Sequence, residues 1–282
     1  RDVLGSRGLG DVYKRQFINS ARKGEKMSIR TDLALESINA AKISEGITKT
    51  ERGKAFKITE INIAEDKHGE KIGKKKGKYI TLEGSVFSCF SKDFREMCEE
   101  FSEELSQFVP DGKVLVVGLG NNDITPDALG PQTASKILAT RHLKEELKDE
   151  DDFLTSLRPV GVLASGVLGQ TGIETAELID GLMEKIDPQA IIAVDALACS
   201  DINRLGKTIQ LSDTGISPGS GVQNKRRELS EATLGVPVIA VGVPTVVDMH
   251  TIVHDYTGNK ISGSMPNMMV TPRDIDRLIE RS

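Results

Sequence analysis

Two aspartates of this sequence follow strand-like apolar runs, where a pair of carboxylates could carry out acid–base chemistry. Asp195 comes directly after the run IIAV, and Asp127 lies in the loop segment TPDALGP, which follows the run KVLVVGLGN. Burying an unpaired carboxylate is costly, so an acid at the end of an apolar strand is typical of a site that binds or reacts. Two neighbouring carboxylates can share one proton, so that one activates water while the other protonates a leaving group. The pair therefore indicates hydrolysis by two acids.

Each aspartate also has a purely structural interpretation. Asp195 can cap a following helix, and Asp127 can stand in the first turn of a helix behind Pro126, where the helix dipole favours an acid. The nearby loops VVGLGNNDITPDALGP and SDTGISPGSGVQNKRREL supply further polar side chains. The candidates for a supporting role are Asn121, Asp123 and Asn224.

Signatures of cofactor and metal binding are incomplete. Gly118-Leu119-Gly120 begins like a dinucleotide fingerprint, but the third glycine is missing at the required spacing. His250 and His254 are four residues apart, but the stretch HTIVH lacks the glutamate of the HExxH zinc motif. We therefore expect no cofactor and no bound metal.

The elements that position these residues alternate between strands and helices from residue 111 to residue 282. Typical buried strands are KVLVVGLGN, RPVGVLAS, QAIIAVDAL and VPVIAVGVPTVV, and TIQLSD is a shorter one. Helical periodicity marks ASKILATRHL, ETAELIDGLMEKI and DMHTIVHDY. This alternation predicts an α/β fold, a three-layer α/β/α sandwich with a mostly parallel sheet. Ligands bind beyond the carboxyl ends of such strands, where both aspartates are expected.

The chain before residue 111 divides into three parts. Residues 1–26 have no periodicity that leads into the rest, and we interpret them as an artefactual or propeptide segment. Residues 27–50 contain a predicted helix from Arg30 to about Ile47. Residues 51–110 are predicted to form a small β-rich and helical insertion. Its lysine run, Lys74–Lys76, is interpreted as a solvated turn, with a contact to an acidic substrate as the alternative.

The overall composition indicates a soluble, cytoplasmic globular protein. The net charge of -5 argues against nucleic acid as a direct partner, because phosphate binding needs a concentrated basic face. Neither a membrane-spanning run nor a signal peptide is present in the sequence, and three unevenly spaced cysteines fit reduced thiols. The final stretch, DIDRLIERS, is helix-like and lacks a capping signal, so we expect the main domain to be truncated at its C-terminus.

The sequence contains several long motifs of irregular composition: VVGLGNNDITPDALGP, LASGVLGQTGIETAELI, MMVTPRDIDRLIE and the long stretch that begins AVDALACSDINRLG. Together they resemble the motifs of the germination protease family of spore-forming bacteria. The resemblance implies an endopeptidase that degrades small acid-soluble spore proteins in the spore core, with a fold similar to hydrogenase maturation proteases. It carries the catalytic aspartates onto Asp127 and Asp195, and it implies a homotetramer.

The resemblance also implies a zymogen that removes its own propeptide. The family's cleavage sequence has an acid followed by an apolar residue, an alanine and a later glutamate. The stretch IRTDLALES matches this pattern, with the bond between Asp32 and Leu33 as the expected cleavage site. Two alternatives stay open: a metallopeptidase like the hydrogenase maturation enzymes, in which these acids and a histidine hold a divalent metal, and a non-catalytic fragment that binds spore proteins.

Overall fold

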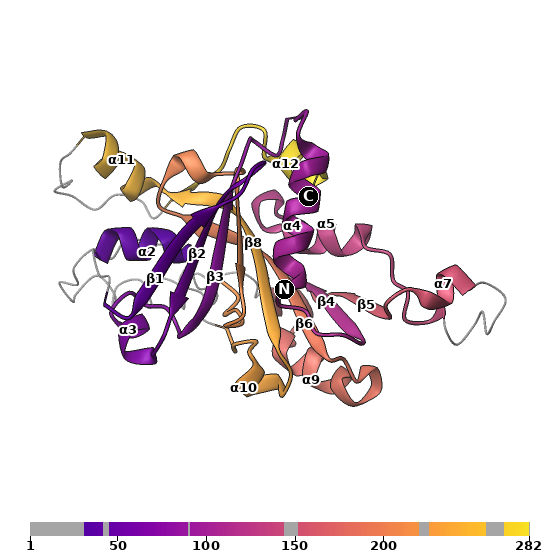
Figure 1. Ribbon diagram of the computed structural model, residues 1–282. Helices are drawn as coiled ribbons and strands as arrows, with labels where there is room; N and C mark the ends of the chain where they lie inside the picture. Colours follow the sequence, from indigo (N-terminus) through magenta and orange to yellow (C-terminus); the bar gives the residue numbers. More distant parts are fainter. Residues whose placement is uncertain are drawn as a thin grey trace, which may run out of the picture.

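The molecule is organised around one mixed β-sheet (Figure 1). The computed structural model describes residues 31–41, 45–89, 91–143, 152–219, 226–257 and 268–281. Within these residues the strands follow the order β1-β2-β3-β7-β8-β6-β4-β5, and β9 pairs with β8. Their bounds are β1 Ile47–Arg52, β2 Lys57–Ile63, β3 Gly77–Glu83, β4 Val114–Gly118, β5 Val160–Ala164, β6 Ala190–Cys199, β7 Thr208–Ser212, β8 Val238–Asp248 and β9 Met269–Val270.

The sheet has a parallel part and an antiparallel part that meet at β8. Strands β8, β6, β4 and β5 run parallel, as the apolar runs predict for strands covered on both faces. Strands β1, β2, β3 and β7 are antiparallel, and β7 pairs with both β3 and β8. The strands of the predicted insertion, residues 51–110, thus continue the same sheet.

Helices cover both faces of the sheet and make it the middle layer of three. On one face lie α4 (Phe94–Ser106), α5 (Leu129–Lys136) and α12 (Ile275–Arg281), and on the other lie α9 (Thr175–Ile186) and α10 (Glu231–Leu234). In Figure 1 the first group is drawn above the sheet and the second below it. Alternate residues of β4 separate the two cores: Val114 and Val116 face α4, whereas Leu115 and Val117 face α9. The predicted α/β sandwich is confirmed.

The first described helix, α2 (Ala34–Ala41), is shorter than the sequence predicts. The expected helix from Arg30 to about Ile47 is wrong at its end, because β1 begins at Ile47 and pairs antiparallel with β2. The β-branched residues of ITKTER favour an extended strand over a helix. Helix α2 packs its apolar face against Ile61, Ile63 and Tyr79 of β2 and β3. The segment just before α2 is thereby fixed close to the sheet.

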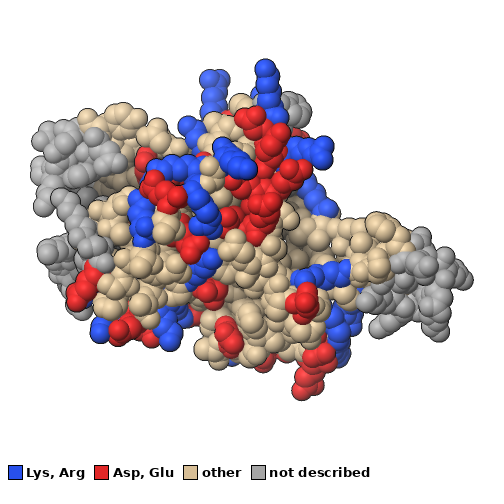
Figure 2. All heavy atoms as spheres, in the orientation of Figure 1, with Lys and Arg blue, Asp and Glu red and all other residues tan. Residues whose placement is uncertain are grey.

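The surface of the view in Figure 2 carries both signs of charge. A strip of acidic side chains follows α4, whose sequence FREMCEEFSEELS contains five glutamates. Among the described residues, no helix has the length and apolar character needed to cross a membrane.

Candidate active site

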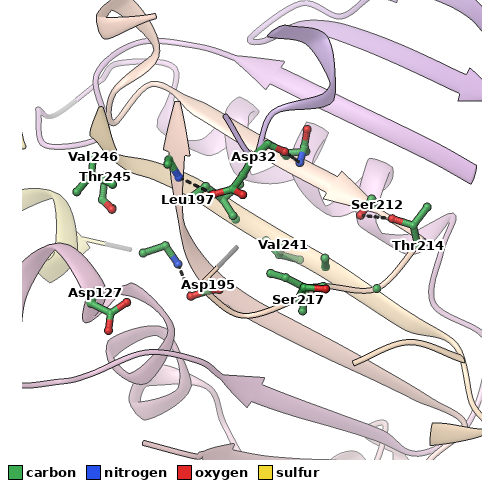
Figure 3. Close-up of a pocket in the computed structure, with 18 of the residues that line it drawn as sticks. Asp32, Asp127, Asp195, Leu197, Ser212, Thr214, Ser217, Val241, Thr245 and Val246 are labelled. Carbon is green, nitrogen blue, oxygen red and sulfur yellow. Dashed lines mark hydrogen bonds between the residues drawn. The ribbon is translucent and has the colours of Figure 1, made fainter. Parts of the chain in front are cut away.

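A cavity of about 570 Å³ opens beside the parallel strands and contains both candidate aspartates. Its walls come from β6, β7 and β8, from the loop after β4, and from the turn that precedes β3. Asp32, from the segment before α2, lines the same cavity (Figure 3). Three aspartates that are far apart in the sequence therefore meet in one place.

Asp195 lies in β6 at the point where the neighbouring strand β4 has ended. The last residue of β4, Gly118, pairs with Val194, so Asp195 is the first residue of β6 beyond that pairing. The expectation that Asp195 ends its strand is wrong, since Ala196–Cys199 continue to pair with β8. The end of β4, rather than of β6, leaves room for the carboxylate.

Burial dominates the electrostatics of Asp195. Its side chain is only 6% exposed, and its carboxylate accepts a hydrogen bond of 2.9 Å from the backbone N–H of Ala196. Burial, and then the negative charges of Asp127 and Asp32, raise the pKa of Asp195 well above its usual value. Both effects act in favour of the protonated form of this carboxyl.

Asp127 ends the short 3-10 helix η1 (Thr125–Asp127) that follows β4. Its Oδ2 accepts a hydrogen bond of 2.7 Å from the backbone N–H of Asn121, and burial raises its pKa. Gly120 permits this turn: its φ is +112°, and a Cβ there would lie 2.1 Å from the carbonyl oxygen of Asp127. The glycines that resemble a nucleotide motif thus bring Asp127 to the cavity.

The other sequence candidates lie elsewhere. Asn121 and Asp123 are absent from the cavity lining, and both accept hydrogen bonds from the side-chain amide of Gln170, at 2.9 Å and 2.8 Å. They therefore hold the shape of the Asp127 loop. Asn224 lies outside the described residues.

The segment around Asp32 is joined to β6 at Ala198. The backbone N–H of Asp32 donates to the carbonyl of Ala198 (2.9 Å), and its Oδ2 accepts from the backbone N–H of Ala198 (2.8 Å). The next side chain, Leu33, is 0% exposed and lies in an apolar cluster with Leu197, Cys199, Leu205 and Val247. The backbone on both sides of the bond between Asp32 and Leu33 is thus held in place against β6.

Glu36, three residues after Leu33, is held by a second set of contacts. It is 4% exposed, and its carboxylate accepts hydrogen bonds from the backbone N–H groups of Ser200 (2.6 Å) and Asp201 (3.1 Å), from the Ser200 hydroxyl (2.7 Å) and from Arg204 (3.2 Å). Because charge-assisted bonds are strong, Glu36 anchors α2 to the segment after β6.

Three residues in these contacts were not predicted as site residues: Lys74, Arg204 and Gln210. The ammonium group of Lys74 reaches the carbonyl oxygen of Asp32 at 2.7 Å, so the interpretation of a wholly solvated lysine turn is wrong for this residue. Only the lysine run hinted at a contact, whereas a single glutamine in TIQLS and a single arginine in INR have no distinctive spacing.

Among the described residues, no group of three or more His, Cys, Asp or Glu side chains is arranged to hold a metal ion. The three aspartates of the cavity instead contact backbone groups or act on one another by charge.

Comparison with known proteins gives a consistent result. A family model described as germination protease matches residues 24–261. The chain is 47% identical over 241 residues to a germination protease of Clostridium acetobutylicum, covering 81% of the chain and 73% of that relative. It is 45% identical over 246 residues to one of Priestia megaterium (81% and 66%) and 41% identical over 267 residues to one of Bacillus subtilis (86% and 72%).

Proposed function

Because the chain belongs to the germination protease family, we propose that it is an endopeptidase that hydrolyses peptide bonds with the acid pair Asp127 and Asp195. One observation supports the proposal most strongly. Asp32, the residue before the proposed cleavage site, lines the cavity that contains the two carboxylates, and its backbone is held against β6. Their raised pKa values favour a state in which the pair keeps one proton.

The two carboxylates take different roles in this proposal. The pKa of Asp195 is raised further than that of Asp127, so Asp195 carries the proton and Asp127 is ionised. Asp127 accepts a proton from the attacking water, and Asp195 donates its proton to the nitrogen of the leaving amine. This is the division of labour expected when environment separates two carboxyl groups in pKa.

The proposed substrates are those that the resemblance to the germination protease family implies. We propose that the enzyme cuts small acid-soluble spore proteins in the cytoplasm of the germinating spore, and that it first removes its own N-terminal segment at the bond between Asp32 and Leu33. The positions of Leu33 and Glu36 support a preference for an apolar residue directly after the cut and an acid three residues later. Assembly as a homotetramer is a further proposal, which mass photometry would test.

Cleavage of a purified small acid-soluble spore protein tests the acid pair. Protein beginning at Leu33 is compared with its Asp127→Asn and Asp195→Asn variants, each with and without a chelator. We expect both variants to lose cutting by about 10²-fold or more, since each removes a group that moves a proton. Asp180→Asn, on the exposed side of α9, is the matched control and should cut like the parent.

Other outcomes favour the alternatives. Cutting that a chelator stops would indicate the metallopeptidase, because acid-pair hydrolysis needs no metal ion. Binding of the spore protein without cutting by the folded parent, unchanged in Asp195→Asn, would indicate a binding fragment.

A further inference from the structure

The carbonyl oxygen of Asp32 accepts two hydrogen bonds from side chains. The ammonium group of Lys74 lies 2.7 Å from this oxygen, and the side-chain amide nitrogen of Gln210 lies 3.0 Å from it. This carbonyl belongs to the peptide bond between Asp32 and Leu33. Two donors, one of them charged, are thus directed at the oxygen that becomes negative when water attacks this bond.

Lys74 is brought there by a tightly built turn. The backbone N–H of Lys74 donates to the carbonyl of Gly69 at 3.0 Å, at the end of α3 (Asp66–Glu70). A Cβ on Gly69 would lie 2.1 Å from the carbonyl oxygen of Lys74, so only glycine permits this approach. Burial lowers the pKa of Lys74, and the charges of Asp32 and Glu36 oppose that shift. A cation withdrawn from water interacts more strongly with charge that develops beside it.

The two lysines that follow behave differently, which gives a natural comparison. Lys75 forms an ion pair with Glu228, and both residues line the same cavity. Lys76 is exposed, and its backbone N–H donates a hydrogen bond of 3.3 Å to the carboxylate of Asp66. Of this lysine run, Lys74 contacts the peptide bond.

Gln210 contacts the chain on both sides of the bond. It lies in β7, is 8% exposed, and donates through Nε2 to the carbonyl of Asp32. Its Oε1 accepts a hydrogen bond of 2.7 Å from the backbone N–H of Ala34. The Gln210 side chain therefore binds both the carbonyl of Asp32, before the bond, and the backbone N–H of Ala34, after it. This fixes the position of the bond along the cavity.

We propose that Lys74 and Gln210 form the oxyanion-binding pair of this protease. Resting on the proposed function, the assignment adds two catalytic residues to the acid pair. Water attacks the carbonyl carbon of Asp32 and gives a proton to Asp127, while the carbonyl oxygen takes the negative charge between Lys74 and Gln210. The carbon–nitrogen bond then breaks, and Leu33 nitrogen takes the proton of Asp195. The products are a carboxyl group on Asp32 and an amino group on Leu33.

The same pair would serve a substrate bound from solution. A spore protein that places its own acid, apolar residue and alanine where Asp32, Leu33 and Ala34 lie presents its carbonyl to the same two donors. The site thus uses one arrangement for self-cleavage and for cutting in trans.

The test compares the wild type with variants of the full chain. Mass spectrometry follows the product that begins at Leu33, which gives the first-order rate of cleavage between Asp32 and Leu33. Removing one oxyanion donor typically lowers a rate by about 10²- to 10³-fold. We expect such a loss for Lys74→Met and for Gln210→Met. Lys74→Arg should keep more activity, because the charge remains. Lys76→Met is the matched control and should cleave like the wild type.

Chemical rescue separates a lost charge from a damaged fold. Propylammonium added to Lys74→Ala should raise its cleavage rate in proportion to concentration, and it should leave Asp195→Asn unchanged. Cleavage by Lys74→Met within about threefold of the wild type would overturn the oxyanion pair and leave the acid pair standing. A wild type that never cuts this bond would overturn self-processing and the oxyanion pair together.

Discussion

At the scale of single residues, the surroundings of Asp195 suit it to donate a proton but lower the stability of the folded state. Its carboxyl group is buried among strand residues, near the charges of Asp127 and Asp32. These surroundings favour the protonated form that a general acid requires. They also mean that folding at neutral pH must either hold a proton on Asp195 or bury its charge, and each is unfavourable relative to the unfolded chain.

Asp195→Asn is therefore expected to stabilise the protein at pH 7. The pKa of Asp195 is higher in the folded state than in the unfolded chain, where it is about 3.9. The folded state then binds more protons, so the wild type loses stability as the pH rises from about 4 through the folded pKa. The unfolding midpoint of Asp195→Asn should exceed that of the wild type at pH 7, by about 2–4 °C per kcal/mol gained, and the difference should shrink towards pH 4. A variant less stable than the wild type at pH 7 would contradict this account.

The sequence singles out Asp127 and Asp195, which both line the cavity, whereas it does not connect Lys74 or Gln210 with them. Asp127 and Asp195 stand out because an acid next to an apolar strand is unusual. Gln210 lies 176 residues from Ala34, and Lys74 lies 42 residues from Asp32, so only the folded sheet brings these pairs together. An isolated polar residue in a short strand carries no sign of which segment it will meet.

At the scale of elements, α2 holds the bond between Asp32 and Leu33 in place through its first turn. Glu36 accepts hydrogen bonds from the segment 200–204, and Arg204 binds Glu83 of β3 as well, at 2.9 Å. Leu33 adds a buried apolar contact. Helix α2, strand β3 and the loop after β6 are thus linked through Glu36 and its partner Arg204.

Glu36→Gln should lower the free energy of unfolding by about 1–3 kcal/mol, because charge-assisted bonds are replaced by weaker ones beside the half-buried Arg204. Denaturant unfolding measures the change, and cleavage between Asp32 and Leu33 should slow in the same variant. The control is Glu96→Gln, an exposed glutamate in the first turn of α4, with an expected change of less than about 0.5 kcal/mol. Equal effects of the two substitutions would show that Glu36 does not anchor the segment.

The elements themselves were predictable to different degrees. Runs such as VLVVG and VIAVGV are apolar on both faces, so a buried parallel strand is the natural interpretation. The strand ITKTER is mostly exposed, which weakens any periodic signal, and its pairing with β2 decides its structure. Strand β7 lies between β3 and β8, and β3 precedes β7 by more than 100 residues in the sequence. No local sequence pattern predicts a pairing between strands so far apart.

At the scale of the whole molecule, one apolar cluster links the two parts of the sheet. Ile80 and Leu82 of β3 pack in the same core as Val116 of β4 and Val241 of β8. Residues 51–110 and residues 111–282 both contribute side chains to this core. We therefore expect the two parts to unfold in one transition and not as separate domains.

Ile80→Ala tests that expectation. Ile80 is fully buried, and removing its side chain should cost about 2–5 kcal/mol. The loss should appear in a single transition that includes the hydrogen exchange of β6 amides, far from the substitution. Ile173→Ala, at an exposed isoleucine, should change stability by less than about 0.5 kcal/mol. A variant that loosens β1–β3 while β6 stays fully protected would indicate two independent domains.

The most direct test of the central claim is a time course of the intact mass of the full chain at several protein concentrations. The account predicts a product that begins at Leu33, formed with a first-order rate that does not depend on concentration, since the bond and the acid pair lie in one molecule. Asp127→Asn and Asp195→Asn should leave the bond between Asp32 and Leu33 intact. Cleavage at another bond, or equal cleavage in Asp195→Asn, would contradict the claim that this acid pair cuts the bond held in its own cavity.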